Sequence, residues 1–230
     1  MSDKAHFHLN RNVNKQNFRY WAAENPHMLH QKPLYSEKVT VWCGVSAFGV
    51  FGPCFLENAT GQSVTVTSDR YVEPLREFLN DELCRLRVDT RLVWFQQDGA
   101  TTHTAQNSMA VVRRLFLQHV ISRFRDDEWP PRSPDLSACD FFLWGYLKEK
   151  VYAHGSHTIQ ELKDCIQEEI QGIPVNMLRK VMDNVKQHAE MCLTSNGAHL
   201  SDITFKKWLE NVMLFHVAYQ CLASYDLIFN

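Results

Sequence analysis

The sequence lacks an excess of basic residues. Lys and Arg total 24 against 26 Asp and Glu, which gives a formal net charge of −2 at pH 7 with His neutral. Proteins that bind nucleic acid on their own usually carry a clear basic excess. Any contact with DNA therefore has to depend on a local patch or on a partner domain.

The sequence also lacks a cysteine framework. The odd count of seven cysteines, without CxxC or Cys/His knuckle spacing and without a signal peptide, argues against a secreted, disulfide-bonded domain. We expect a reducing compartment, with most thiols acting as small buried apolar groups. The histidines lack HExxH or knuckle spacing, which excludes a zinc site (His6, His8, His27, His30).

No apolar run is long enough for a convincing membrane span. The most apolar tract, 212–229, is interrupted by His216, Gln220 and Asp226 and has no polybasic flanks. With 230 residues, 45% of them hydrophobic and no internal repeat, the chain is neither disordered nor collagen-like. We expect an intracellular protein without a membrane partner.

Strands dominate the first half of the predicted fold. Residues 3–9 alternate, with Phe7 on the apolar face, and 39–45 and 50–56 read as a hairpin; 63–67 adds a further short strand. A helix starts at Ser68 and is expected to begin late or kink at Pro74.

Strands and helices alternate in the second half, which ends in helices. We expect strands at 91–97 and 120–124, and helices at 102–117, 138–151, from the capping box of Thr158 and Glu161 to Gly172, and at 177–193. This order predicts a mixed α/β layer architecture.

Three aspartates occupy informative positions. Asp98 directly follows a buried strand, where α/β sheets place ligands, although an Asp-Gly turn explains it equally simply. Asp140 begins a helix, where it could just complement the helix dipole, and Asp135 could be a cap or a ligand. Asp3 shares the apolar face of the first strand, unless it belongs to a frayed terminus.

A mixed sheet could bring Asp3, Asp98 and Asp140 together at one edge. Such carboxylates repel one another unless a divalent cation binds, and hard oxygen ligands select Mg²⁺ or Mn²⁺. Two such ions about 4 Å apart clamp the attacking and leaving oxygens of a phosphodiester displacement.

Four segments carry a family resemblance. They read SDKAHFHLN from residue 2, VWCGV from residue 41, WFQQDGATTHTA from residue 94, and WPPRSPDL from residue 129, which leads to DFFLW from residue 140. In this order they resemble the catalytic domain of mariner-type DDE/DDD transposases of the Tc/mariner superfamily. The resemblance runs from residue 2 to about residue 207.

The resemblance implies an RNase H-like fold, a mixed sheet flanked by helices with additional C-terminal helices. It places the catalytic and metal-binding roles on Asp3, Asp98 and Asp140, with two Mg²⁺ or Mn²⁺ ions, and leaves Asp135 without a ligand role. The activity it implies is metal-dependent DNA strand cleavage and transfer in transposition. The separation of 41 residues between Asp98 and Asp140 makes the third acid an Asp in a longer-spaced variant of the family pattern.

The resemblance also implies partners and a location. The partners are DNA, as transposon ends and target, and either a second copy of the chain or a full-length relative; the location is the nucleus. We expect residues 1–207 to form the catalytic domain, with its first strand truncated. Residues 208–230 form a divergent apolar tail whose role the sequence does not define.

Three departures from the family favour a second hypothesis. The first strand starts late, no helix-turn-helix module precedes it, and Lys4 stands where the family pairs the acid with glutamate. Lys4 either competes electrostatically with metal or points to solvent. The second hypothesis is therefore a catalytically inactive remnant that binds nucleic acid or acts as an interaction module.

Other residues have two interpretations each. His103 either contacts a phosphate or supports the site, or packs at a helix start. The basic residues either line a DNA path or form a solvated surface (Arg113, Arg114, Arg123, Arg125, Lys148, Lys150). Trp21 and Trp42 are expected in the core, and Trp129 is the better candidate for a DNA contact.

Overall fold

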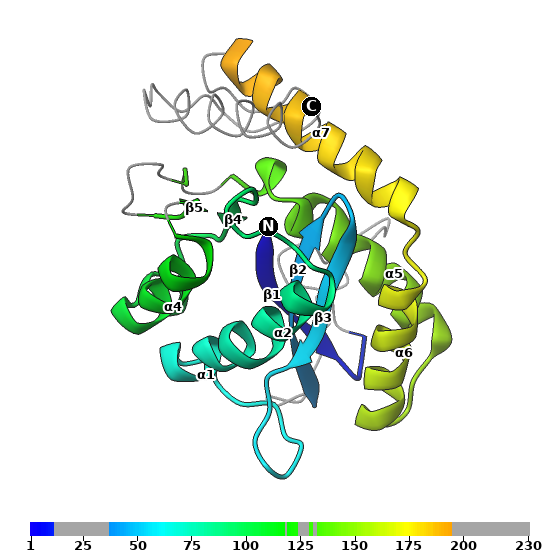
Figure 1. Ribbon diagram of the computed structural model, residues 1–230. Coiled ribbons are helices and arrows are strands. Elements are labelled where there is room, and N and C mark those ends of the chain that lie inside the picture. Colours follow the sequence, from blue (N-terminus) through cyan, green and yellow to red (C-terminus); the bar gives the residue numbers. More distant parts are fainter. Residues whose placement is uncertain (12–36, 118, 124–128, 131–132, 195–230) are drawn as a thin grey trace, which may run out of the picture.

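The computed structural model describes residues 1–11, 37–117, 119–123, 129–130 and 133–194. An antiparallel hairpin at its centre consists of β2 (Lys38–Ser46) and β3 (Gly49–Phe55). The alternating segment at the start of the chain forms β1 (Ser2–His8), which pairs antiparallel with the other edge of β2 (Figure 1). Both the alternating strand and the hairpin predicted from the sequence are confirmed.

A second, parallel pair of strands extends this sheet. It consists of β4 (Phe95–Gln96) and β5 (Val120–Ile121). One parallel bridge between Ser2 and Gln97 joins it to β1, and the Ser2 hydroxyl donates to the Gln96 carbonyl at 3.4 Å. The resulting order, β3-β2-β1-β4-β5, is a mixed sheet in which Asp98 follows directly after the contact with β1.

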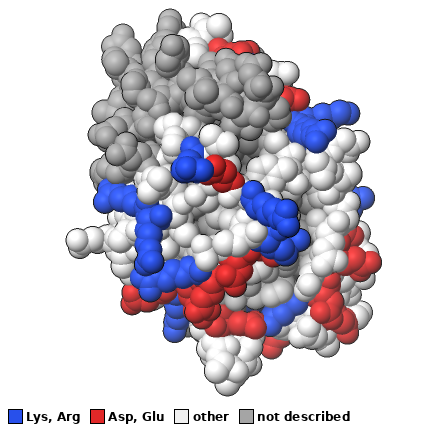
Figure 2. Space-filling view, in the orientation of Figure 1, with Lys and Arg blue, Asp and Glu red and all other residues white. Residues whose placement is uncertain are grey.

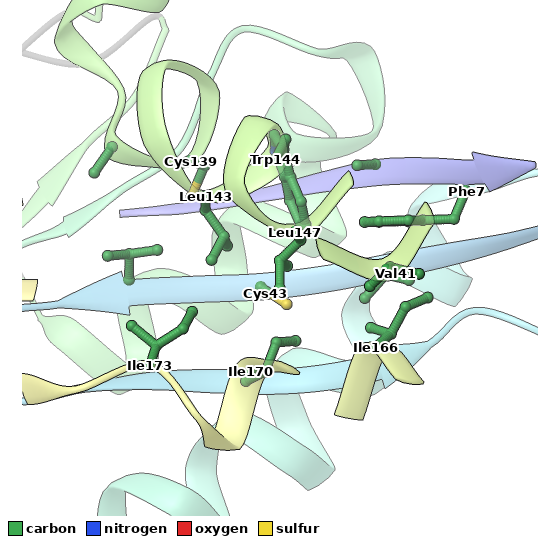
Figure 3. Packing of buried hydrophobic residues seen from close by; sticks show 14 of the residues in the cluster. Phe7, Val41, Cys43, Cys139, Leu143, Trp144, Leu147, Ile166, Ile170 and Ile173 are labelled. Atoms are coloured by element: carbon green, nitrogen blue, oxygen red, sulfur yellow. The ribbon is translucent and has the colours of Figure 1, made fainter. Parts of the chain in front are cut away.

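One face of the sheet packs against the C-terminal helices. Every second residue of β1 and β2 faces these helices and forms one core cluster with them, including Phe7, Val41 and Cys43 (Figure 3). Leu147 and Ile166 in this cluster are fully buried. The covering elements are the π-helical segment η4 (Cys139–Leu143), α5 (Trp144–His154), α6 (Ile159–Gln171) and α7 (Val175–Thr194).

The other face packs against a separate helical layer. Trp42 points to this side and is fully buried with Tyr71 and Leu75. The covering elements are α1 (Ser68–Glu73), the π-helical segment η2 (Pro74–Leu79), α2 (Asn80–Arg85) and α4 (Gln106–Phe116). Two helical layers thus enclose the sheet, which confirms the predicted α/β class and the core position of Trp42.

Local signals set two helix starts correctly. Thr158 accepts the backbone N–H of Glu161 at 3.1 Å, so the capping box forms at the start of α6. Thr67 accepts the N–H of Arg70 at the start of α1. Pro74 does not end the helix, because the backbone continues through η2 with π-helical geometry.

Three sequence predictions are wrong or too long. Residues 63–67 form no strand and contribute only a bridge between Ser63 and Glu57. The strand predicted at 91–97 shortens to β4. The helix predicted at 102–117 breaks at Ala105 into α3 (Thr101–Thr104) and α4. Two backbone carbonyls of α3 accept hydrogen bonds from side chains instead of from backbone N–H groups of a continuing helix. The Ser108 hydroxyl donates to the carbonyl of Thr102, and the Gln97 side-chain amide donates to the carbonyl of His103.

The cysteines only partly follow the prediction of buried thiols. Cys43 and Cys139 are buried, Cys84 is exposed, and the other described thiols are half-buried. Predictions for Trp21, His27, His30, Arg125, Cys221 and the tail 208–230 concern residues outside the described ranges. Among the described residues, no helix combines the length and apolarity that a bilayer crossing requires.

Candidate active site

Two of the three predicted acids meet where β1 and β4 join. Asp3 follows Ser2 in β1 and Asp98 follows Gln97, and the bridge between Ser2 and Gln97 sets these positions side by side. Ligand atoms of Asp3, Asp98 and His103 all lie within 4.8 Å of one another. Segments 95 residues apart in sequence therefore supply one compact set of donors.

Asp3 is a half-buried carboxylate with two hydrogen-bond donors. Trp144 donates its indole N–H to Oδ2 at 2.9 Å, and the backbone N–H of Lys4 also donates to it. Burial and the negative charge of Asp140, with a smaller effect of Asp98, raise the pKa of Asp3 to about 6 despite these donors. The site therefore holds a carboxylate whose charge is poorly compensated.

Asp98 has the opposite electrostatics. Its Oδ1 accepts the N–H of Ala100 at 3.0 Å and lies against Nδ1 of His103. Burial acts to raise the pKa of Asp98, but its interaction with His103, together with the N–H of Ala100 and the charge of Lys4, outweighs burial and lowers the pKa to about 2. Asp98 is therefore held as a carboxylate.

Asp140 lies within electrostatic range of this pair and not in direct contact with it. It begins η4 on the exposed side of that helix. Burial of its carboxyl group and the charge of Asp98 raise the pKa of Asp140, while a hydrogen bond from Ser137 opposes the rise. All three predicted acids therefore interact, with Asp3 and Asp98 at the centre and Asp140 beside them.

Asp135 is separate from this group. It lies in the 3₁₀ turn η3 (Pro134–Leu136), and its backbone carbonyl accepts a hydrogen bond from Nδ1 of His188 at 2.6 Å. It does not belong to the cluster of potential ligands formed by the described residues.

The donor set suits a hard divalent cation. Two carboxylates lie within reach of one ion, and a third acts on them through its charge. A divalent cation between Asp3 and Asp98 would remove the repulsion that raises the pKa of Asp3. Oxygen donors favour Mg²⁺ or Mn²⁺, and water or a phosphate would supply the other ligands of such an ion.

Sequence reasoning missed the polar side chains that support the acids. Trp144 reaches Asp3 across 141 residues, and buried Gln97 bonds Tyr71, His103 and Ser122. These contacts join residues far apart in sequence, so no local pattern predicts them. The available signal was a pair of polar residues, Gln96 and Gln97, at the end of an otherwise apolar run.

Among the described residues, Arg123 and Lys148 bring basic side chains close to the segments that carry the acids. The Arg123 side chain lies against Gly99, so that a Cβ there would be 2.8 Å from its Cδ and the side chain would have to shift. Lys148 lies close enough to Asp3 for the acid to oppose the lowering of its pKa by burial. Arg113, Arg114 and Lys150 are exposed, and Figure 2 shows both charge signs interspersed on the viewed face.

The prediction that Trp129 contacts DNA is wrong. Its side chain is only 5% exposed and packs in a small cluster with Ile121, Leu136 and Ala189. A buried indole provides no surface on which a base could stack. The proline turn positions this residue toward the core instead.

An apolar cavity of about 140 Å³ lies behind β4, near but not at the acids. Its lining includes Trp42, Phe51, Phe95 and Met182, and it contains no carboxylate. This cavity therefore offers no acidic ligand, unlike the carboxylate cluster beside it.

No protein-family model matches the chain. The chain is 24% identical over 196 residues to the human histone-lysine N-methyltransferase SETMAR, a match that covers 81% of this chain and 26% of SETMAR. The chain thus spans about a quarter of that relative.

Solved structures of a mariner transposase share the fold. The Mos1 mariner paired-end complex with Mn superposes with a TM-score of 0.64 at 21% identity, covering 87% of this chain and 56% of that one. The Mos1 transposase catalytic domain with raltegravir and Mn gives 0.61 at 21% identity, covering 72% of this chain and 78% of that domain.

The fold is that of an RNase H-like domain, as the sequence motifs implied. The chain shares this fold with the mariner transposase structures, and the resemblance of its motifs to the catalytic domain of mariner-type transposases is confirmed.

Proposed function

We propose that the chain cleaves and transfers DNA strands in a reaction that depends on Mg²⁺ or Mn²⁺. The observation that carries this proposal is the convergence of Asp3 and Asp98, with Asp140 beside them, from three separate segments of the chain. The three would act together as the metal ligands of a two-ion site. Mos1 structures with Mn and with Mg support the choice of ion.

Each acid has a distinct part in this proposal. Asp98, with its pKa lowered to about 2, offers a permanently charged ligand, and Asp3 gains a compensating charge when an ion binds. The ions supply the polarisation that activates a water or 3′-hydroxyl nucleophile and stabilises the leaving oxygen. The protein would position the nucleophile and the scissile phosphate and stabilise the charge that develops in the transition state.

DNA is the proposed partner. The Mos1 structures similar to this chain include a complex with a left transposon end and a strand transfer complex. Because the chain spans about half of those proteins, we propose that a further module or partner reads the transposon ends. Pairing with a second copy or a full-length relative, and a nuclear location, belong to the same proposal.

Lys4 favours a second candidate function. Its ammonium lies 3.2 Å from Nε2 of His103, so it points toward the site and not to solvent. Its positive charge contributes to lowering the pKa of Asp98. A fixed cation beside the ligands weakens binding of a divalent ion, which fits a catalytically inactive domain that retains only nucleic-acid binding.

A nicking assay separates the two candidates. Purified protein with Mn²⁺ is expected to nick supercoiled plasmid DNA, and Asp98→Asn is expected to abolish nicking with the fold intact by circular dichroism. Asp135→Asn is the matched control, because it removes a nearby carboxylate outside the cluster, and it should nick like the parent.

Two results contradict the catalytic proposal. Nicking that survives Asp98→Asn means that the acids do not carry the activity. A folded parent that binds DNA without nicking it supports the inactive candidate.

A further inference from the structure

His103 is a fully buried histidine with charged groups at both ring nitrogens. Its Nδ1 lies against Oδ1 of Asp98, and its Nε2 lies 3.2 Å from the ammonium of Lys4. Lys4, His103 and Asp98 therefore form a continuous chain of polar contacts beneath the site. The sequence left open whether this histidine contacts phosphate or supports the acids.

The ring of His103 has little freedom to move. It stacks on Tyr71 with centroids 4.2 Å apart and planes 27° from parallel. The Tyr71 hydroxyl donates to Oε1 of Gln97 at 2.9 Å, and Nε2 of Gln97 donates to the carbonyl of His103 at 3.0 Å. The same buried amide thus fixes both the backbone of His103 and the ring that stacks on it.

The neighbours of the ring determine where its proton lies. An ammonium only donates, so Nε2 of His103 has to accept from Lys4. A carboxylate only accepts, so Nδ1 has to donate to Asp98. The arrangement selects the tautomer with the proton on Nδ1.

We propose that His103 is a positioning residue that orients Asp98 for cation binding through the proton on Nδ1. The N–H of Ala100 donates to Oδ1 of Asp98, and Nδ1 of His103 lies against the same oxygen. Among the described residues Oδ2 accepts no hydrogen bond, which leaves it as the oxygen for the cation. This inference rests on the proposed function, in which Asp98 is a metal ligand.

Two substitutions of His103 test the positioning role. Asparagine places an amide donor near the position of Nδ1, whereas glutamine places one near Nε2. His103→Gln is expected to weaken Mn²⁺ binding, measured by calorimetric titration, about tenfold to a hundredfold, as loss of an outer-sphere partner does. His103→Asn should stay within about threefold of the parent, since it keeps the donor to Asp98. Equal losses in both variants would overturn the inference.

The ring tautomer supplies a readout that needs no metal. Long-range ¹H–¹⁵N spectra of the full chain are expected to show the His103 proton on Nδ1. Lys4→Met removes the donor to Nε2 while keeping the length of the side chain, and Asp98 should still hold the proton on Nδ1. A proton on Nε2 in the parent would overturn the inference.

The two proposals fail in different ways. If Asp98→Asn leaves Mn²⁺ binding unchanged, the proposed metal site is wrong, and the His103 proposal, which rests on it, falls as well. If Asp98→Asn abolishes Mn²⁺ binding but the His103 proton lies on Nε2, the metal site stands and the positioning role of His103 is refuted.

Discussion

Replacing Asp3 by asparagine is expected to stabilise the metal-free domain at neutral pH. Burial and the charge of Asp140 raise the pKa of Asp3 from 3.8 to about 6. At 1.36 kcal/mol per pH unit, the ionised carboxylate therefore costs the folded state about 3 kcal/mol. Asparagine keeps an oxygen for the indole of Trp144 and loses one acceptor, so we expect a net gain of about 1–2 kcal/mol.

The pH dependence follows from the direction of the shift. The folded state binds the Asp3 proton more tightly than the unfolded state, so this group's contribution to the unfolding free energy falls as pH rises from about 4 to about 6. His6 acts in the opposite direction in this range, because burial and Lys38 lower its pKa to about 4. Only the difference between variant and parent therefore isolates Asp3.

Urea denaturation with EDTA present measures this difference. The gain from Asp3→Asn should be full near pH 7 and nearly absent near pH 4. Asp164→Asn is the control: it lies on the exposed surface of α6, and its side-chain oxygen can still accept the hydrogen bond from Gln160. A gain of the same size at both pH values, or a loss at pH 7, would refute the assignment of strain to the ionised Asp3.

Two further changes test the support and the core around the site. Trp144→Phe removes the indole N–H that donates to Asp3. Because this bond is stronger to the ionised carboxylate, the loss in unfolding free energy should be about 1.5–3 kcal/mol larger at pH 8 than at pH 4, where Asp3 is protonated. Equal losses at both pH values would contradict this role of Trp144. Leu147→Ala in the fully buried cluster should cost about 2–5 kcal/mol in urea denaturation. Leu92→Ala, at a residue 67% exposed, should cost less than about 0.5 kcal/mol, and similar losses at the two positions would contradict the core assignment.

Local chemistry explains which elements the sequence predicted well. The alternation around Phe7, the hairpin and the capping box of Thr158 depend on neighbours close in sequence, and all three are confirmed. The helix predicted at 102–117 forms, but it divides at Ala105 into α3 and α4. The Ser108 hydroxyl donates to the Thr102 carbonyl, and the Gln97 amide donates to the His103 carbonyl from outside the helix. The second of these contacts has no signal in the sequence of the helix.

The acids were predictable, and their surroundings were not. Asp98 follows a strand and Asp140 lies near the start of a helix, and the sequence pattern indicates both positions. The direct partner of Asp3, Trp144, and the orientation of Lys4 toward His103 depend on contacts across 141 and 99 residues. The sequence singled out three acids. The structure brings Asp3 and Asp98 together with His103 in one cluster of potential ligands, and Asp140 lies outside that cluster.

A thermal melt with and without Mn²⁺ tests the proposed metal site most directly. An ion at a hundredfold excess over its dissociation constant stabilises the folded state by about 2.7 kcal/mol, or roughly 5–10 °C for a domain of this size. We expect that shift in the parent and in Asp164→Asn, and no shift in Asp98→Asn. The same Mn²⁺ shift in all three proteins, or none in a cooperatively melting parent, would contradict a metal site built on these carboxylates.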